Sequence, residues 1–333
     1  MKKLLALALS LLLVVAAFAG CGAPKDDVSS APQQVVSATI RIAGMKGPTT
    51  MGLASLLDRN SKGETHNEYV FSLKGAADEI TPLLNKGELD IAAVPANLAA
   101  TLYNKTEGKI TLLAVNTLGV IYITERGETV KSVADLKGKT IFATGKGTTP
   151  EYSLRYILTK NGLDPDKDVK VEWFGEASEV VAKAAQTAGA VAMLPQPYVT
   201  VAGTKIADLR VALDLNAEWN KTETDSMMVT GVVIARTEFL KENKDAVDAF
   251  LKEYKASIEF ANENVAETAT LIEGLGIIEK AAIAEKALPF CNLKFLAGAE
   301  MKTAVGGYLK VLYDNNPAAV GNKLPDDAFY YAK

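Results

Sequence analysis

Residues 40–50 read IRIAGMKGPTT, and residues 140–150 read TIFATGKGTTP. Each stretch predicts a β-strand, then a turn of glycine and lysine, then a helix that starts beside paired threonines. Threonine is a favoured helix N-cap and proline suits the first helical position, while Thr148 and Glu151 have capping-box spacing. Because the pattern occurs twice, we expect two equivalent turns at the carboxyl ends of two strands, where ligands bind in open α/β sheets.

The rest of the chain alternates short β-branched runs with longer helical periods, which predicts an α/β protein with mostly parallel strands. Apolar residues at three- and four-residue spacing predict helices over Ala77–Lys86 and Ala246–Asn262. The expected strands are Ala38–Ala43, Glu68–Leu73, Ile91–Val94, Ile110–Val115, Val120–Thr124, Thr140–Thr144, Val169–Phe174, Ala190–Leu194, Arg210–Leu215 and Thr230–Ala235.

Residues 1–20 have the layout of a secretory signal peptide: two lysines, an apolar run from Leu4 to Phe18, and then Ala19-Gly20 before Cys21. The run is too short to span a bilayer comfortably. Its end resembles the bacterial lipobox, which implies lipidation of Cys21 and cleavage just before it. The alternative is ordinary secretion with Cys21 unmodified. Residues 21–36 are rich in small, polar and proline residues and predict a flexible tether.

The composition excludes several classes of function. The net charge is -4 without a long basic tract, so nucleic acid is not an expected partner. His66 is the only histidine, which rules out a metal site built from several histidines, and no metal or cofactor is expected. No Gly-x-Ser-x-Gly elbow is present, and Gly138-Lys139-Thr140 lacks the first glycine of a P-loop. Cys291 lies in an apolar stretch and is interpreted as a small core residue.

Four segments resemble one family, the type II periplasmic-binding-protein fold, in its branch of nitrate-, sulfonate-, taurine- and thiamine-precursor-binding proteins. The segments are Asn85–Ala92 (NKGELDIA), Val94–Asn97 (VPAN), Asp135–Ile141 (DLKGKTI) and Gly231–Arg236 (GVVIAR). The resemblance covers nearly all of 37–333. It implies two lobes of mixed, mostly parallel sheet flanked by helices, joined by two crossings that form a hinge.

Carried onto this chain, the resemblance implies a first lobe of residues 37–123 and 231–333 and a second lobe of residues 124–230. It also implies a function: an extracytoplasmic binding protein that delivers a small molecule to the permease and ATPase subunits of an ABC importer. The lipobox-like end predicts that lipid anchors the protein to the bacterial membrane, and a monomer is expected because the sequence has no coiled coil or obvious pairing segment. An enzyme is not expected.

The candidate ligand contacts lie at the strand ends that would face each other across the cleft. Lysines, threonines and helix starts favour an anionic or strongly polar ligand group, and tyrosines suit a heterocyclic or aromatic part. On the first wall they are Lys46, Gly47, Pro48, Thr49, Thr50, Pro95, Ala96 and Asn97, with Gly119 and Tyr122 near the crossing; on the second they are Lys146, Gly147, Thr148, Thr149, Tyr152, Gln196 and Tyr198.

Two alternatives stay open at this point. A surface sensor lipoprotein would bind a ligand without transporting it. Some relatives with this fold are enzymes of thiamine- or menaquinone-precursor metabolism, which would be expected in the cytoplasm, so the predicted export signal argues against them.

Overall fold

The computed structural model of the chain describes residues 38–75, 77–222 and 226–332. The predicted signal peptide, the lipidated Cys21 and the tether of residues 21–36 lie outside these residues and stay predictions. The described residues all belong to one compact unit of the chain.

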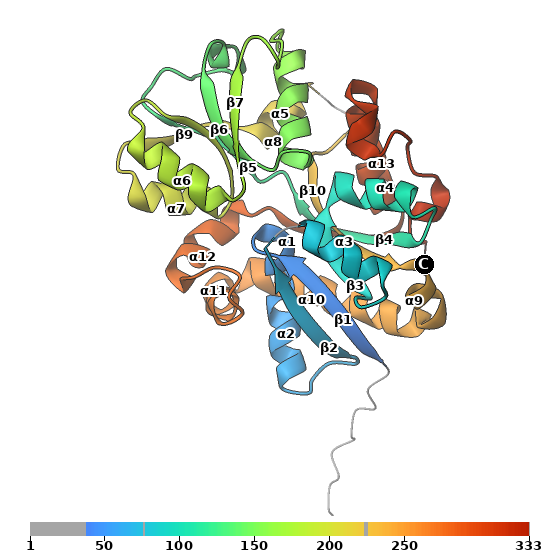
Figure 1. Cartoon of the computed structure of the whole chain (residues 1–333). Coiled ribbons are helices and arrows are strands. Elements are labelled where there is room, and N and C mark those ends of the chain that lie inside the picture. The colour runs from blue at the N-terminus through green and yellow to red at the C-terminus, as the bar shows by residue number, and fades with distance from the viewer. Residues whose placement is uncertain (1–37, 76, 223–225, 333) are drawn as a thin grey trace, which may run out of the picture. The chain divides into compact units, whose positions relative to one another are not determined.

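Two separate sheets form the framework of this unit, shown in Figure 1. The first sheet contains β1 (Thr39–Met45), β2 (Glu68–Lys74), β3 (Ile91–Pro95), β4 (Ile110–Leu118), β10 (Val229–Arg236) and β11 (Leu293–Leu296). Its strand order is β11-β4-β10-β3-β1-β2. β1 pairs in parallel with β2 and β3, whereas β10 runs antiparallel to both β3 and β4, and β11 antiparallel to β4.

The second sheet contains β5 (Ile121–Arg126), β6 (Thr140–Thr144), β7 (Lys170–Phe174), β8 (Val191–Pro195) and β9 (Leu209–Asp214). Its order is β7-β6-β8-β5-β9. β6 pairs in parallel with β7 and β8, and β5 pairs antiparallel with β8 and β9. β5 and β10, which each follow a crossing between the sheets, therefore pair only antiparallel with their neighbours.

Helices cover the faces of both sheets. They are α1 (Pro48–Met51), α2 (Ala54–Ser61), α3 (Ala77–Asn85), α4 (Ala96–Lys105), α5 (Thr149–Lys160), α6 (Ala177–Gln186), α7 (Tyr198–Lys205), α8 (Leu215–Thr222), α9 (Thr237–Glu242), α10 (Lys244–Glu263), α11 (Val265–Gly274), α12 (Ala281–Ala287) and α13 (Gly298–Asn315), with 3-10 turns η1 (Val133–Leu136), η2 (Leu288–Phe290), η3 (Pro317–Val320) and η4 (Asp327–Phe329). Long helices bury one face: α10 packs Val247, Phe250 and Tyr254 into the core.

The predicted fold class is confirmed. All ten predicted strands are present, with ends that differ by at most three residues, and both predicted helices form as α3 and α10. Strand β11 was not predicted because it has only four residues and one of them is Lys294. A short strand of this kind carries little periodicity.

The chain crosses between the sheets at Gly119 and Val120, since β4 ends at Leu118 in the first sheet and β5 begins at Ile121 in the second. Residues 121–123, which the predicted lobe boundary assigns to the first lobe, therefore pair within the second sheet. The chain returns between α8 and β10, and the last helix, α13, follows β11.

A buried carboxylate fastens the first sheet at the edge where β3 begins. Asp90 is 1% exposed and accepts hydrogen bonds from the Arg41 backbone, from the Arg41 guanidinium at 2.6 and 2.8 Å, and from Arg236 at 3.1 Å. Burial alone would raise the pKa of Asp90, but the hydrogen bonds from the two arginines outweigh it and lower the pKa. Asp90 thus joins β1 and β10 through their arginines.

Candidate functional site

The first candidate turn joins β1 to α1. Gly47 has a φ of 127°, which favours glycine, and Pro48 is the first residue of a single helical turn. The predicted threonine cap is wrong here: Thr50 Oγ1 donates to the Met45 carbonyl at 2.6 Å, behind it in the chain, and Gly47 is the N-cap. Lys46 is exposed, Thr49 is half-buried and Thr50 is buried.

The second candidate turn joins β6 to α5. Thr148 is the N-cap of α5, but its Oγ1 donates to the Gly145 carbonyl at 2.8 Å and accepts no backbone hydrogen bond. The predicted capping box is also wrong. The Thr148 amide is bonded to the Gly145 carbonyl, so the Glu151 carboxylate accepts from the Gly147 amide instead, at 2.6 Å. A carboxylate of the protein therefore already occupies one amide of this turn.

The second turn meets the end of β3 through Asn97, the second residue of α4. Its Oδ1 accepts from Thr149 Oγ1 at 3.2 Å, and its Nδ2 lies 3.5 Å from the Gly147 carbonyl and 3.2 Å from the Ala319 carbonyl. Asn97 is 3% exposed and Thr149 is 1% exposed. Candidate residues from the two walls are thus brought together, and these two side chains are bonded to each other. Pro95, half-buried, and Ala96, buried, precede Asn97 at the end of β3.

The crossing residues form a second meeting point. The Gly119 carbonyl accepts from Asn292 at 3.1 Å, and Tyr122 OH donates to the Phe290 carbonyl at 3.3 Å. Burial, and to a smaller extent the charge of the nearby Asp214, raises the pKa of Tyr122 to about 12. The hydroxyl of Tyr122 therefore stays protonated at neutral pH. Tyr198 is half-buried, and its pKa is raised by burial and by Glu176 and Glu279.

Two candidate residues have side chains engaged elsewhere. Gln196 is buried, and its Oε1 accepts from Thr200 at 3.0 Å within the first turn of α7. Tyr152 lies beside the last helix, in a small surface cavity that Leu312 and Asn316 also line. Gly147 is exposed and Thr148 is half-buried, so of the second turn these two and the exposed Lys146 are accessible.

A buried polar cluster under the first turn was not predicted. Asn116 Nδ2 donates to the Thr49 carbonyl at 2.9 Å, and Thr117 Oγ1 donates to Asn116 Oδ1 at 2.9 Å. A Cβ at Gly231 would lie 2.5 Å from both Asn116 Oδ1 and Thr49 Cγ2. The available signal was the Asn-Thr pair inside the apolar strand Ile110–Leu118, because asparagine is depleted in strands.

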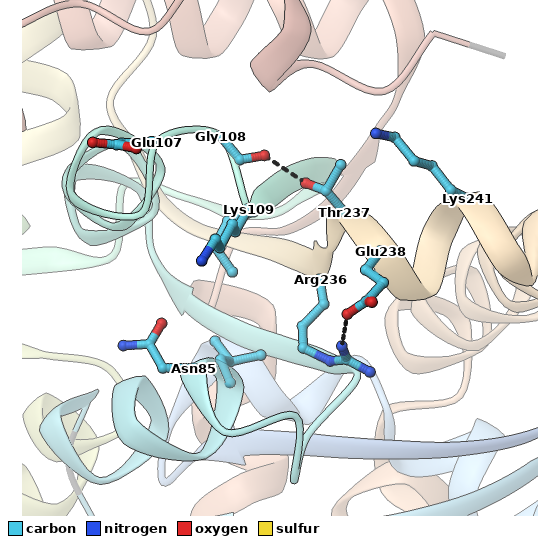
Figure 2. Close-up of a pocket in the computed structure, with 10 residues that line it drawn as sticks. Asn85, Glu107, Gly108, Lys109, Arg236, Thr237, Glu238 and Lys241 are labelled. Carbon is cyan, nitrogen blue, oxygen red and sulfur yellow. Dashed lines mark hydrogen bonds and ion pairs between the residues drawn. The ribbon is translucent and has the colours of Figure 1, made fainter.

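A pocket of about 590 Å³ lies where β4 begins and β10 ends, away from both turns (Figure 2). Two of the side chains that line it, Arg236 and Thr237, hold the sheet edge together. Arg236 bonds to Glu238 at 3.2 Å as well as to Asp90 and the Leu89 carbonyl, and Thr237 Oγ1 donates to the Gly108 carbonyl at 2.9 Å. We therefore place the candidate ligand site at the turns and not in this pocket.

Two further properties bear on function. Among residues 38–75, 77–222 and 226–332, no group of three or more histidine, cysteine, aspartate or glutamate side chains is placed to hold a metal ion. Within the same described residues, no helix is both long and apolar enough to cross a membrane.

The fold and its paired turns define a class: a two-lobed α/β protein of the type II periplasmic-binding-protein fold. Residues 78–268, more than half of the chain, match the family model described as NMT1/THI5 like. The chain belongs to this family, and the predicted family resemblance is confirmed. A comparison with curated proteins gives no match.

Solved structures agree with this class. The chain is 27% identical to an ABC transporter from Parabacteroides distasonis, with a TM-score of 0.74 over 89% of this chain and 99% of that one. It shares its fold with the periplasmic aliphatic sulphonate binding protein SsuA from Escherichia coli (18% identity, TM-score 0.70, 88% and 92% covered). It also shares it with the periplasmic nitrate-binding protein NrtA from Synechocystis PCC 6803 (16% identity, TM-score 0.57, 80% and 75% covered).

Proposed function

We propose that the protein is the substrate-binding component of an ABC importer, which captures a small polar or anionic organic molecule between its two lobes. The observation that supports this best is that the residues after β3 of the first sheet and after β6 of the second meet at Asn97, Gly147 and Thr149. The sulphonate- and nitrate-binding relatives support a ligand in the same class. Signal cleavage and lipid at Cys21 would place the protein outside the cytoplasm on a membrane.

In this proposal residues 38–118 and 229–332 form one lobe and residues 121–222 the other, which moves the predicted boundary to the strands that begin and end at the crossings. The crossing at Gly119 and Val120 and the return before β10 form the hinge. Movement about the hinge closes the lobes on the ligand, and the permease senses the closed form. The protein acts as a monomer, and the ATPase subunit of the importer supplies the energy.

The ligand class follows from the accessible groups of the two turns. Lys46 and Lys146 are exposed, and neither forms an ion pair with a carboxylate in the part of the chain that the structure describes. Tyr122 and Tyr198 are half-buried and offer ring faces for a heterocyclic or aromatic portion. Because Glu151 already occupies the Gly147 amide, the lysines rather than the start of α5 carry the attraction for an anion.

Binding without catalysis fits the same groups. His66 is exposed, and its backbone amide donates to Glu253 of α10. A proton-transfer site at the turns would therefore lack an imidazole, and no cofactor is proposed.

The first experiment is a thermal-shift screen of the full chain in detergent against sulfonates, aromatic and heterocyclic acids, vitamin precursors, nucleobases and amino acids. A ligand present at 100 times its Kd adds ~2.7 kcal/mol to folding stability. An unmodified hit supports the proposal and names the substrate class. Chemical turnover of the hit, or no shift with any compound, would count against it.

Charge recognition is tested with the hit. Lys46→Ala combined with Lys146→Ala should weaken binding of an anionic ligand about tenfold. The matched control is Lys105→Ala with Lys205→Ala, which removes one exposed lysine from each lobe at the far ends of α4 and α7. Glu151→Gln keeps an acceptor for Gly147 but removes a negative charge, so it should strengthen the same binding about two- to fivefold. Equal affinities in all variants would remove lysine recognition from the proposal.

Transport is separated from sensing by the partners. An importer component should copurify with a permease and an ATPase from the native membrane. Ligand binding without these partners would favour the sensor lipoprotein.

A further inference from the structure

The last helix, α13, joins the two lobes along one side by a buried aromatic contact. Trp219 of α8 lies between Tyr156 of α5 and Tyr308 of α13, with ring centroids 4.8 and 5.2 Å apart. All three side chains are buried, and Tyr308 OH lies 3.0 Å from Ser153 Oγ. By sequence α13 belongs to the first lobe, whereas α5 and α8 belong to the second.

A buried polar network continues this contact. Asn97 bonds to Thr149 in the second lobe and to the Ala319 carbonyl in η3, which directly follows α13. Ser153, one turn after Thr149 in α5, completes the link to Tyr308. Because these groups are buried and hydrogen-bonded, separating them would leave several polar atoms without partners, at a cost for each atom.

The burial on this side is large. A buried Trp or Tyr covers about 150–250 Å² of surface, and one apolar core cluster runs through both lobes by way of Trp219 and Tyr308. Conformers that interconvert in a binding protein differ by only a few kcal/mol. The buried cluster of three tilted rings is too large a contact to open and close in each binding cycle, so this side stays together.

The other face of the second sheet contacts the first lobe at a place with small and exposed side chains. There α7 contacts α12, and Tyr122 OH donates a hydrogen bond to the Phe290 carbonyl. Phe290 is 56% exposed, and α12 is a seven-residue helix rich in alanine. In Figure 1, α12 and α7 lie on one side of the molecule and α13 on the other.

We infer that α13 with α5 and α8 is a fixed pivot, and that the lobes part on the opposite side, between α7 and α12, where the Tyr122–Phe290 contact acts as a releasable clasp. The inference rests on the proposed capture of a ligand between the lobes, and it specifies the side by which that ligand enters.

Spin-label distances in the ligand-free full chain test it. One pair is placed across the gate at Lys205→Cys and Lys286→Cys, the other across the pivot at Thr159→Cys and Lys310→Cys; all four positions are exposed. Cys21→Ser is included throughout, and Cys291 is buried and stays unlabelled. We expect a narrow single distance across the pivot and a broader distribution with a longer-distance population across the gate.

Two conservative variants sharpen the result. Tyr122→Phe removes the hydrogen bond of the clasp. It should increase the longer-distance population across the gate about threefold, because the loss of one hydrogen bond shifts the equilibrium between the two populations by about that factor. Tyr308→Phe keeps the aromatic ring in the cluster and should leave the spin-label distance across the pivot unchanged. Equal widths for the two pairs, or a broader pivot, would overturn the inference. No ligand is needed, so a silent ligand screen and a failed gate are distinct outcomes.

Discussion

Thr149 Oγ1 donates a hydrogen bond to Asn97 Oδ1 at 3.2 Å, and this bond joins a helix that follows β6 of the second sheet to a helix that follows β3 of the first. Both residues were predicted to bind ligand from opposite walls. In the structure their side chains bind each other, which makes the pair a structural link beside the accessible groups of the turns.

Thr149→Val should destabilise the protein, because it keeps the shape of the side chain but leaves the buried Asn97 Oδ1 without this donor. We expect the free energy of unfolding to fall by about 1–3 kcal/mol. Urea denaturation measures the change. Thr159→Val, an exposed threonine at the end of the same helix, is the control and should change stability by less than about 0.5 kcal/mol. Equal effects of the two variants would show that the Asn97 contact adds nothing.

Gly231→Ala should destabilise the floor of the first turn. The added Cβ would lie 2.5 Å from Thr49 Cγ2 and Asn116 Oδ1, so a strand or the turn must shift, at a cost of about 1–3 kcal/mol. The opposite result is expected at Gly203 of α7, where a Cβ meets nothing within 4 Å and alanine should stabilise the helix by up to about 1 kcal/mol. Thermal unfolding of the two variants compares the signs directly.

The pH dependence of stability should contain a contribution from Asp90. Its pKa is lower in the folded protein than the ~3.9 of an unfolded chain, so the folded form binds this proton more weakly. The stabilisation is therefore complete above about pH 4 and is lost as the pH falls through the folded-state pKa. Asp90→Asn should cost about 3–5 kcal/mol at pH 7, because Arg41 and Arg236 lose their buried partner.

Urea unfolding measured from about pH 3 to about pH 7 checks the Asp90 prediction. The curves of the native protein and Asp90→Asn should converge as the pH falls. Glu88→Gln, which changes an exposed carboxylate two residues away, should follow the native curve. A constant gap between the native protein and Asp90→Asn at every pH would contradict the lowered pKa.

The sequence predicted the framework well because it depends on period and composition. The β-branched runs that mark β6 and β10 are buried strands, and the repeated turn marks equivalent positions in two sheets. Side-chain direction was not predictable in the same way. Thr50 and Thr148 bond backward to carbonyls and do not cap their helices, because glycines with positive φ fold each turn so that these carbonyls come within reach.

Long-range contacts set the rest of the site. Asn97 meets Thr149 across 52 positions of sequence, and Tyr122 meets Phe290 across 168. No local pattern reports such a pairing. The buried aromatic contact likewise could not be predicted, because its three residues lie at ordinary helical positions in the sequence. Only the fold shows that they connect two lobes: Tyr156, Trp219 and Tyr308.

Thiol titration of the full chain should separate its two cysteines. Cys291 is fully buried, and burial raises its pKa, so a water-soluble disulfide reagent should not react with it in the folded protein. After unfolding in guanidinium chloride, one thiol per chain should react if Cys21 carries lipid on its sulfur, and Cys291→Ser should then give none. Two reactive thiols in the unfolded protein would refute lipidation of Cys21, because a free sulfur there would react with the reagent as Cys291 does. A fast reaction in the folded protein that Cys291→Ser abolishes would instead show that the core around Cys291 opens.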